Sequence, residues 1–204
     1  MNEKIIMKIL NLYAGIGGNR KLWNGNIDVI AVEKDETIAN IYKDLFPQDQ
    51  VIIGDAHEYL LKNYKNFDFI WSSPPCQTHS SFRQNICVRF RGTEPKYPSM
   101  ELYEEILFLT YNADCYWIIE NVNPYYPPLI EPTAILQRHF FWSNFSIKEK
   151  SFSKDCIRKS QIPDFQKKYG IDLSKYALSN KRQILRNCVL PELGEHIFNH
   201  ITST

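Results

Sequence analysis

Short, almost continuously apolar segments recur along this 204-residue chain and alternate with stretches of helical character. Strands that are apolar on both faces are typical of parallel sheets, because helices cover each side of such a sheet. The pattern predicts an α/β fold with a Rossmann-like, doubly wound and mostly parallel sheet. The segments expected to form strands lie within residues 4–14, 28–33, 50–54, 67–73, 116–121 and 138–145.

Helical periodicity is clearest in residues 35–46 and 99–113, where apolar side chains recur three and four positions apart. Residues 146–180 lack a comparable apolar rhythm, and we expect them to form a small peripheral section. The predicted organisation is therefore a core over residues 1–145, a reduced section over 146–180, and a closing segment with a helix over 181–204 that returns to the core.

The composition, 44% hydrophobic and 23% charged, is that of a soluble globular protein. No apolar run approaches the roughly 20 residues that span a bilayer, and the N-terminus is too mixed for a secretory signal. We expect a cytoplasmic protein without a membrane partner.

Residues 1–144 carry 13 Lys and Arg against 17 Asp and Glu, whereas residues 145–204 carry 11 Lys and Arg against 6 Asp and Glu. This basic end could face a polyanion, although a solvated surface explains the charge equally well.

Cysteines and histidines give no sign of a metal site or a disulfide framework. The five cysteines are odd in number and contain no C-x-x-C pair. His196 and His200 lie four residues apart on an expected helix, which we interpret as a solvated helix face because no nearby acid completes a ligand set. The sequence therefore predicts no metal.

A glycine turn directly follows the first expected strand, in "LNLYAGIGGNRKLW". Glycines there let the backbone approach a ligand closely, although a purely structural turn would use them too. A dinucleotide fingerprint would need glycine at Arg20, so a nicotinamide dehydrogenase is disfavoured. Glu33 ends the second strand 18 residues after Gly15 and could bind ribose hydroxyls. Asp55, at the end of the third strand, could accept from an adenine amine. Together they suggest an adenosyl ligand, and S-adenosylmethionine fits.

Two prolines precede Cys76 in "SSPPCQTHS", directly after the fourth strand. Prolines stiffen the backbone, so they would present the thiol on a rigid support. Glu120 ends the fifth strand and should reach the same sheet edge. A thiolate that adds to carbon 6 of cytosine makes carbon 5 nucleophilic, and a carboxylic acid at ring nitrogen 3 assists the addition. An inert buried cysteine and an ordinary strand-end acid are the alternatives.

The ordered set "YAGIGG", "VEKD", "GDA", "PPCQ", "ENV" and "RNCVLP" resembles the DNA (cytosine-5) methyltransferases. The resemblance covers residues 8–144 and 181–191, and it implies the class I fold of methyltransferases that use S-adenosylmethionine. The chain would be a very short member with a minimal target-recognition section. The reaction implied is methyl transfer to carbon 5 of cytosine in DNA through a covalent Cys76 adduct at carbon 6.

The resemblance also implies roles for individual residues. Cys76 would be the nucleophile, Glu120 would hold the base, and Arg138 would lie beside the thiol and the cytosine carbonyl. Lys34 would flank the adenine, where the family often has an aromatic residue. The full set implied to bind S-adenosylmethionine is Tyr13, Gly15, Ile16, Gly18, Glu33, Lys34, Asp55, Ala56, Pro75, Asn187 and Val189.

The chain departs from the family pattern at three places. Pro-Cys-Gln usually continues with Gly-Phe-Ser, whereas this chain has Thr78 and His79 before its serine. His79 is expected to alter contacts near the flipped base or the backbone. The family's Gln-x-Arg-x-Arg element matches "QRHFF" only in part, and this match assigns Arg138 to the site. Arg186 stands where the family has glycine before the asparagine of its closing motif.

A cytosine in a duplex must be flipped out before a thiolate can reach it. Residues 80–98 carry four basic side chains and one acid, so we expect a mobile loop that closes over the base and grips phosphates, or else an ordinary exposed loop. With only residues 146–180 between the core and the closing segment, sequence specificity should be short or relaxed.

Two other functions stay open on the sequence. The same chemistry could act on RNA or on a free cytosine nucleotide, and the chain could be a non-catalytic accessory subunit. If the substrate is DNA, a place in restriction–modification is one expectation, and a monomer is the simplest assembly.

Overall fold

The computed structural model describes residues 6–152 and 160–202. A sheet with the strand order β3-β2-β1-β4-β5-β7-β6 runs through the middle of this part of the chain. The first five strands in that order are parallel, and β7 is antiparallel to both of its neighbours. The expected mostly parallel α/β sheet is therefore confirmed. The strands are β1 (Met7–Leu12), β2 (Ile27–Glu33), β3 (Gln50–Ile53), β4 (Phe69–Ser72), β5 (Tyr116–Val122), β6 (Ala134–Leu136) and β7 (His139–Ser143).

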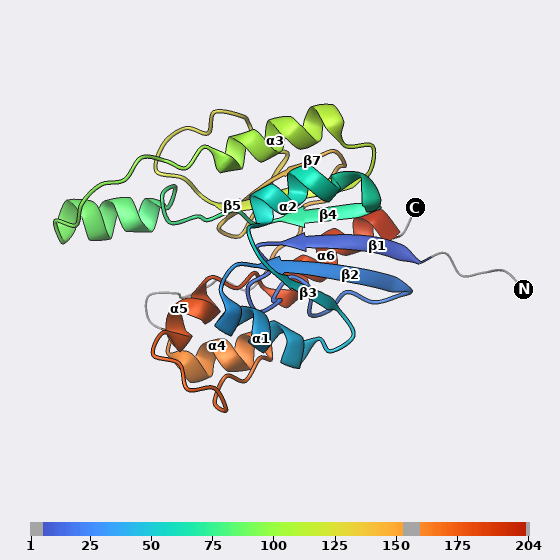
Figure 1. Ribbon diagram of the computed structural model, residues 1–204. Helices are drawn as coiled ribbons and strands as arrows, with labels where there is room; N and C mark the ends of the chain where they lie inside the picture. The colour runs from blue at the N-terminus through green and yellow to red at the C-terminus, as the bar shows by residue number, and fades with distance from the viewer. Residues whose placement is uncertain (1–5, 153–159, 203–204) are drawn as a thin grey trace, which may run out of the picture.

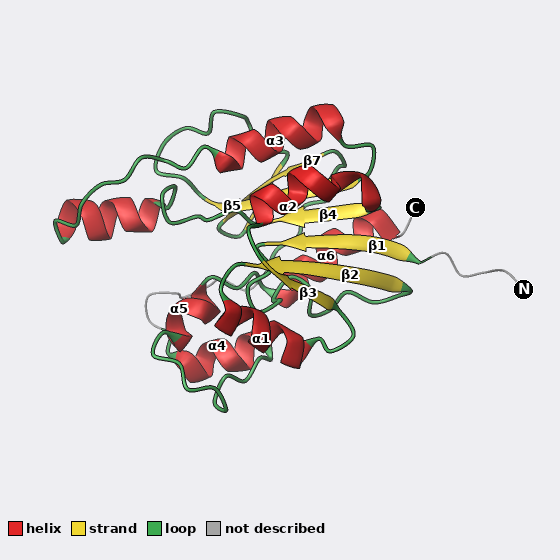
Figure 2. Ribbon diagram, in the orientation of Figure 1, coloured by secondary structure: helices red, strands yellow, loops and turns green. Residues whose placement is uncertain are grey.

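Helices cover both faces of the sheet (Figures 1 and 2). In Figure 1, α2 and α3 lie on one face, and α1, α4 and α6 lie on the other. The α-helices are α1 (Glu36–Leu45), α2 (Ala56–Asn63), α3 (Glu101–Asn112), α4 (Ile162–Tyr169), α5 (Lys181–Arg186) and α6 (Pro191–Thr202). A 3-10 turn (Tyr64–Asn66) follows α2, and a π-helix (Arg83–Phe90) lies between β4 and α3.

Alternate side chains of each strand enter two separate cores. Ile9 of β1 and Trp71 of β4 join the cluster under α6, whereas Leu10 and Ile70 join the cluster under α2 and α3. This alternation is what a strand buried on both faces requires, and it explains the continuous apolar runs of the sequence. Trp23, from the loop after β1, stacks on Phe198 of α6 with ring centroids 5.2 Å apart. Helix α6 is thereby fixed against the sheet.

Arg20 has a structural role. Its guanidinium forms a two-point contact with Asp49, at 2.9 and 3.0 Å, and also donates to the carbonyl of Trp23. Tyr42 donates to the same carboxylate at 2.9 Å. Both members of the ion pair are buried, and a buried pair of this geometry is costly to break. The network ties the β1–β2 loop to the turn before β3.

Four helices or strands were not predicted from the sequence or differ from what was predicted. Helix α2 is short, and its N-cap is Asp55, which accepts from the Glu58 amide at 3.2 Å. Strand β6 has three residues, too few for a periodicity signal. The π-helix occupies residues 83–90, where a loop was expected. Helix α4 forms in the section expected to be peripheral, and it begins with a capping box between Gln161 and Asp164.

The described part of residues 146–180 contributes to the main core. Phe165 and Tyr169 of α4 are buried there, as are Ile171 and Leu173 after it. Cys156 lies outside the described residues. The role of this section in target recognition stays a prediction.

His196 and His200 attach a surface segment to α6. His196 Nε2 is 2.8 Å from the carbonyl of Lys148, and His200 Nε2 accepts from the Lys148 amide at 3.0 Å. Among the described residues there is no group of three or more His, Cys, Asp or Glu side chains placed to hold a metal. Nor does any helix within residues 6–152 and 160–202 have the length and apolar character needed to cross a membrane.

Candidate active site

A cavity of about 540 Å³ opens where the parallel strands end. Ligands of open α/β sheets bind at this edge, and the volume lies within the range of ordinary ligand sites. Every residue that the sequence placed in the site lines this cavity. They are Tyr13, Gly15, Ile16, Gly18, Glu33, Lys34, Asp55, Ala56, Pro75, Cys76, Glu120, Arg138, Asn187 and Val189. Their common location is therefore a finding, while their individual roles stay predictions.

The glycine turn is held by the acid at the end of β2. The amide of Gly15 donates to Oε2 of Glu33 at 2.9 Å, and the amide of Asp35 donates to Oε1 at 2.9 Å. Gly15 has φ +55°, and nothing lies within 4 Å of where its Cβ would stand. The turn is thus open toward the cavity at Gly15. Glu33 keeps further lone pairs for a ligand, since a carboxylate can accept about four hydrogen bonds.

Gly18 is a glycine for a different reason. A Cβ there would lie 2.4 Å from the carbonyl oxygen of Val189 and 2.6 Å from Sγ of Cys188. The closing segment therefore packs directly on the glycine turn. Asn187 caps α5 and, together with Val189, completes the wall of the cavity from the far end of the chain.

Lys34 and Asp55 form an ion pair at the mouth of the cavity. Lys34 Nζ is 3.1 Å from Asp55 Oδ2. The pKa of Asp55 is lowered, first by the amide of Glu58 and then by the ammonium of Lys34. The side chain of Lys34 is 80% exposed, so this ion pair can open at little cost to stability.

Cys76 is fixed by the backbone around it. The amides of His79 and Ser80 donate to its carbonyl at 3.1 and 3.0 Å, and Asn121 Nδ2 donates to the carbonyl of Pro74 at 3.0 Å. The pKa of the Cys76 thiol is raised to about 11, first by burial and then by the charge of Glu120, with Arg138 acting in the opposite direction. The surroundings of Cys76 in this structure therefore favour the thiol over the thiolate at neutral pH.

Glu120 is buried near Cys76 and carries a negative charge. Burial by itself would raise its pKa, but His139, a hydrogen bond from Ser73 and the charge of Arg138 together lower it. His139 Nδ1 contacts Oε1 of Glu120 directly. The sequence had not placed His139 in the site.

Two arginines approach the thiol from different parts of the chain. Arg138 lies in the turn before β7, and its Nη2 donates to the carbonyl of Arg186 at 2.9 Å. The Arg186 guanidinium lies 5.1 Å from the ring centroid of Phe82 and also lines the cavity. Arg186 was missed as a site residue, although the departure from glycine at this position was a usable signal.

Comparison with known proteins decides the family. The model of the C-5 cytosine-specific DNA methylases matches residues 7–123, more than half of the chain. The chain belongs to this family. Its methyl donor is S-adenosylmethionine, and the open glycine turn, the Glu33 carboxylate and the cavity volume fit that molecule. No curated protein matches the chain significantly.

Solved structures resemble the chain at low identity. A methyltransferase from Entamoeba histolytica has 13% identity and a TM-score of 0.42, covering 75% of this chain and 59% of that one. An S-adenosylmethionine-dependent methyltransferase from Agrobacterium tumefaciens has 14% identity and a TM-score of 0.37, and the match covers 59% of this chain and 40% of that one. A conserved hypothetical protein from Streptococcus pyogenes has 14% identity and a TM-score of 0.45, covering 69% and 87%.

A buried carboxylate supports the glycine turn from α3, and the family motifs gave no sign of it. Glu105 accepts from the hydroxyl of Tyr13 at 2.6 Å and from that of Ser72 at 2.6 Å. His57 Nδ1 lies 3.1 Å from the same carboxylate. Glu105 is fully buried, on the face of α3 that carries Leu109. An acid on the apolar face of a predicted helix was the available signal.

Thr78 and His79, which differ from the family pattern after Cys76, connect neighbouring segments of the chain. Thr78 Oγ1 accepts from the amide of Ser99 at 3.0 Å, which fixes the end of the segment that contains the π-helix. His79 is buried against Tyr126, with which it shares a hydrogen bond. His79 is not among the residues that line the cavity. The ring of His79 packs against Tyr103 and Tyr126, and its expected effect on contacts near the flipped base or the backbone stays a prediction.

The π-helix extends away from the sheet, at the left of Figure 1. It carries Arg83 and Arg89, and Phe90 at its end is 84% exposed. Residues 83–90 of the expected basic segment are thus helical, and the segment follows Cys76 and Gln77, which line the cavity.

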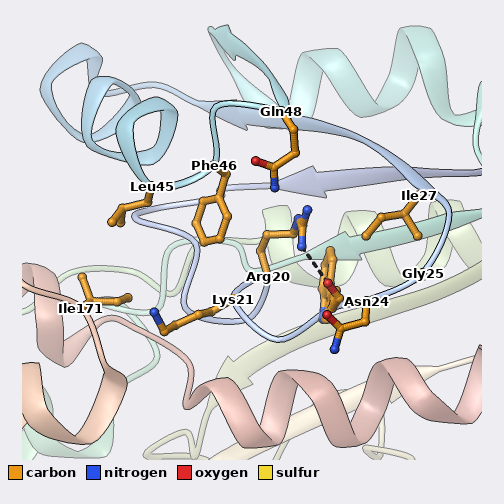
Figure 3. Close-up of a pocket in the computed structure, with 10 residues that line it drawn as sticks. Arg20, Lys21, Asn24, Gly25, Ile27, Leu45, Phe46, Gln48 and Ile171 are labelled. Carbon is orange, nitrogen blue, oxygen red and sulfur yellow. Dashed lines mark hydrogen bonds between the residues drawn. The ribbon is translucent and has the colours of Figure 1, made fainter.

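A second cavity, of about 480 Å³, lies between the β1–β2 loop and the end of α1. Figure 3 shows Arg20 in this cavity, hydrogen-bonded to the carbonyl of Trp23. Lys21 Nζ donates to the carbonyl of Gly170 at 2.8 Å. The two cationic side chains that line this second cavity, Arg20 and Lys21, therefore already have protein partners. None of the residues that the sequence assigned to the site lines this cavity.

Proposed function

We propose that this chain methylates carbon 5 of cytosine in DNA through a covalent bond between Cys76 and carbon 6. The observation that carries the proposal is the shared cavity, in which Cys76 and Glu120 lie together with the glycine turn and Glu33. Membership in the C-5 cytosine-specific DNA methylase family supports the same reaction. A thiol, a carboxyl group and an adenosyl site at one sheet edge are the three parts this chemistry needs.

The wall formed by Gly15, Glu33 and Asp55 would hold the donor. When bound, S-adenosylmethionine supplies an electrophilic methyl group for carbon 5. Glu33 would accept from the ribose hydroxyls, and Asp55 would turn from Lys34 to the adenine amine. Asn187 and Val189 would close the pocket from the side of α5.

Cys76 and Glu120 would act on the cytosine ring. The proton of the Cys76 thiol passes to the Glu120 carboxylate, which shares it with nitrogen 3 while the sulfur forms a bond to carbon 6, and this makes carbon 5 electron-rich. Once carbon 5 carries the methyl group and the rest of the donor has left as a neutral thioether, solvent takes the proton of carbon 5 and nitrogen 3 returns its proton to Glu120. Cys76 then leaves as a thiolate, which restores the aromatic ring. Arg138 and Arg186 stabilise the thiolate, since both act to lower the pKa of Cys76.

Access to the base requires flipping, because stacking hides carbon 6 in a duplex. The basic segment around the π-helix would bind phosphates beside the flipped nucleotide. The described residues between β7 and α5 are few, and α4 is committed to the core. We therefore infer a short or relaxed recognition sequence, with little base readout beyond the cytosine.

Methyl incorporation with base-resolution mapping tests the proposal. Duplex DNA, RNA and dCTP would be compared as acceptors for the labelled methyl group. We expect 5-methylcytosine in DNA at short or varied sequence contexts, and no product with Cys76→Ser. Transfer confined to RNA or dCTP would overturn the choice of substrate, and transfer at full rate by Cys76→Ser would overturn the mechanism.

A further inference from the structure

Arg186 brings a positive charge into the cavity at a position where the family pattern has glycine. It is the last residue of α5, and it lines the same cavity as Cys76. Its backbone is held in place, since the Arg186 carbonyl accepts from Nη2 of Arg138 at 2.9 Å. A glycine carries no side chain, so the family pattern assigns no task to a guanidinium at this position.

The Arg186 guanidinium has donors to spare. Its Nε is buried without a hydrogen-bond partner, and no acid in the described part of the chain forms an ion pair with it. By contrast, Arg83 donates to the carbonyl of Glu94, and Arg89 donates to the side chain of Asn85. A buried N–H without an acceptor is unfavourable, so this position suits an acceptor that enters with a ligand.

The charges around Arg186 are mainly positive. The pKa of its guanidinium is lowered, first by burial and then by the charges of Arg182 and Arg138, whereas Cys87 and Cys76 act in the opposite direction. An anion bound at Arg186 would therefore be attracted by several guanidinium groups at once. Such attraction is stronger in a partly enclosed cavity than in water.

An aromatic ring orients the guanidinium. The Arg186 guanidinium lies 5.1 Å from the ring centroid of Phe82, the residue directly before the π-helix. An arginine that stacks on an aromatic ring keeps its edge N–H groups free for two parallel hydrogen bonds to an oxyanion. The contact therefore prepares Arg186 for a group such as a phosphate.

A flipped nucleotide would bring a phosphate to this side of the cavity. Cytosine and deoxyribose are uncharged at neutral pH, so the phosphates carry all of the negative charge of DNA. The donor has a carboxylate of its own, but Glu33 and Asp55 mark the donor wall at the ends of β2 and β3. Phe82 and Cys76, which lie near Arg186, belong to the side where the base would enter.

We propose that Arg186 binds a phosphate of the flipped nucleotide and thereby holds the cytosine ring against Cys76. The inference rests on the proposed function in taking a cytosine nucleotide as the substrate. The guanidinium donates its N–H groups to the phosphate oxygens while it stays stacked on Phe82. A phosphate contact carries no sequence information, so this contact is compatible with short or relaxed specificity.

Protection of Cys76 from iodoacetamide tests this contact without any methyl transfer. Deoxycytidine and its 5′- and 3′-monophosphates are titrated against the full chain in the presence of S-adenosylhomocysteine, and mass spectrometry follows the Cys76 peptide. We expect one monophosphate to half-protect Cys76 at a concentration at least about tenfold below that of deoxycytidine, because hydrogen bonds between charged groups are the strong ones. Cys115, directly before β5 and away from the cavity, should not be protected.

Three variants separate the charge of Arg186 from its packing. Each is compared with its own rate without nucleotide, so that a changed reactivity of the thiol cancels. Arg186→Gln should reduce the preference for the monophosphate to within about twofold, and Arg186→Lys should keep about threefold, since an ammonium is a point charge without the planar fork. Lys62→Gln, at an exposed position of α2, is the control and should keep the full preference.

Calorimetry with S-adenosylhomocysteine shows whether Arg186 serves the donor instead. We expect Arg186→Gln to change this affinity by less than about twofold, because the donor carboxylate is not its partner. Thermal unfolding checks that each variant is folded. Arg186→Met, which also lacks the charge, takes the place of Arg186→Gln if that variant does not fold.

The proposal is overturned if neither monophosphate protects Cys76 better than deoxycytidine does, or if Arg186→Gln keeps the preference. Equal losses in Arg186→Lys and Arg186→Gln would also contradict it, and a large loss of S-adenosylhomocysteine affinity in Arg186→Gln would assign the guanidinium to the donor. No methyl group is transferred in this assay. A failure here would leave the methylation reaction standing, and a failure of methyl transfer would not change the protection result.

Discussion

The hydroxyl of Tyr13 donates a 2.6 Å hydrogen bond to Glu105, a carboxylate buried under the sheet on α3. Tyr13 has φ +53°, an uncommon conformation for a residue with a side chain. Because the turn that follows it forms one wall of the cavity, Glu105 connects the packing of α3 to the cofactor wall. The geometry of that wall therefore depends on a contact between residues 92 positions apart.

Removal of this hydroxyl should destabilise the fold. Tyr13→Phe leaves the buried Glu105 with one donor fewer, which typically costs about 1–3 kcal/mol. We expect a lower urea midpoint and weaker binding of S-adenosylmethionine by calorimetry. Tyr111→Phe, at an 81% exposed position of α3, is the matched control and should change neither. Equal effects of the two substitutions would show that the Tyr13 hydroxyl carries no structural role.

The His57–Glu105 contact predicts a pH dependence of stability. Its hydrogen bond to Glu105 raises the pKa of His57. A raised pKa in the folded state means that the folded protein binds this proton more tightly than the unfolded chain does. The resulting stability is fully present below the unfolded pKa of about 6.5 and is lost as pH rises through the folded pKa. Urea unfolding between about pH 6 and pH 9 should show this loss, and His57→Asn should reduce it. Identical slopes for the two proteins would contradict the assignment.

Gly18→Ala should displace the closing segment. The new Cβ would meet the carbonyl of Val189 at 2.4 Å, which is backbone and yields only if α5 and its neighbours shift. Overpacking of this kind costs about 1–3 kcal/mol. We expect a lower melting temperature and weaker binding of S-adenosylmethionine. Gly54→Ala is the control, because the nearest atom to its Cβ is 4.0 Å away. Similar losses in both variants would rule out the packing explanation.

The basic segment should make binding to DNA depend on salt. Each phosphate contact that is lost reduces the slope of log K against log salt concentration by about 0.9. Arg89→Gln with Arg91→Gln should therefore lower the slope by up to about 1.8, measured by fluorescence anisotropy on a duplex. Lys62→Gln on α2 is the control and should leave the slope unchanged. An unchanged slope in the double variant would place DNA elsewhere on the molecule.

The location of the site could be predicted from the sequence because parallel strands end at one edge of a sheet. Glu33, Cys76 and Glu120 each end or directly follow an apolar run, so their convergence follows from the topology alone. The contact of Glu120 with His139 could not be predicted in the same way. It depends on the antiparallel register of β5 and β7, which no local pattern specifies.

Other features were missed for related reasons. Helix α4 has eight residues, and its apolar positions Phe165 and Tyr169 give only one turn of periodicity. Glu105 was hidden because a carboxylate on the buried side of α3 is acceptable only once Tyr13 and Ser72 are known to donate to it. Both cases depend on partners far away along the chain.

Covalent trapping tests the central claim most directly. A duplex that carries 5-fluorocytosine blocks the loss of the carbon 5 substituent, so the bond between sulfur and carbon 6 should persist when S-adenosylmethionine is present. The account predicts one denaturation-resistant protein–DNA complex, with the cross-link on the Cys76 peptide by mass spectrometry and absent in Cys76→Ser. Methylation of cytosine without any such complex, or a cross-link on another residue, would contradict it.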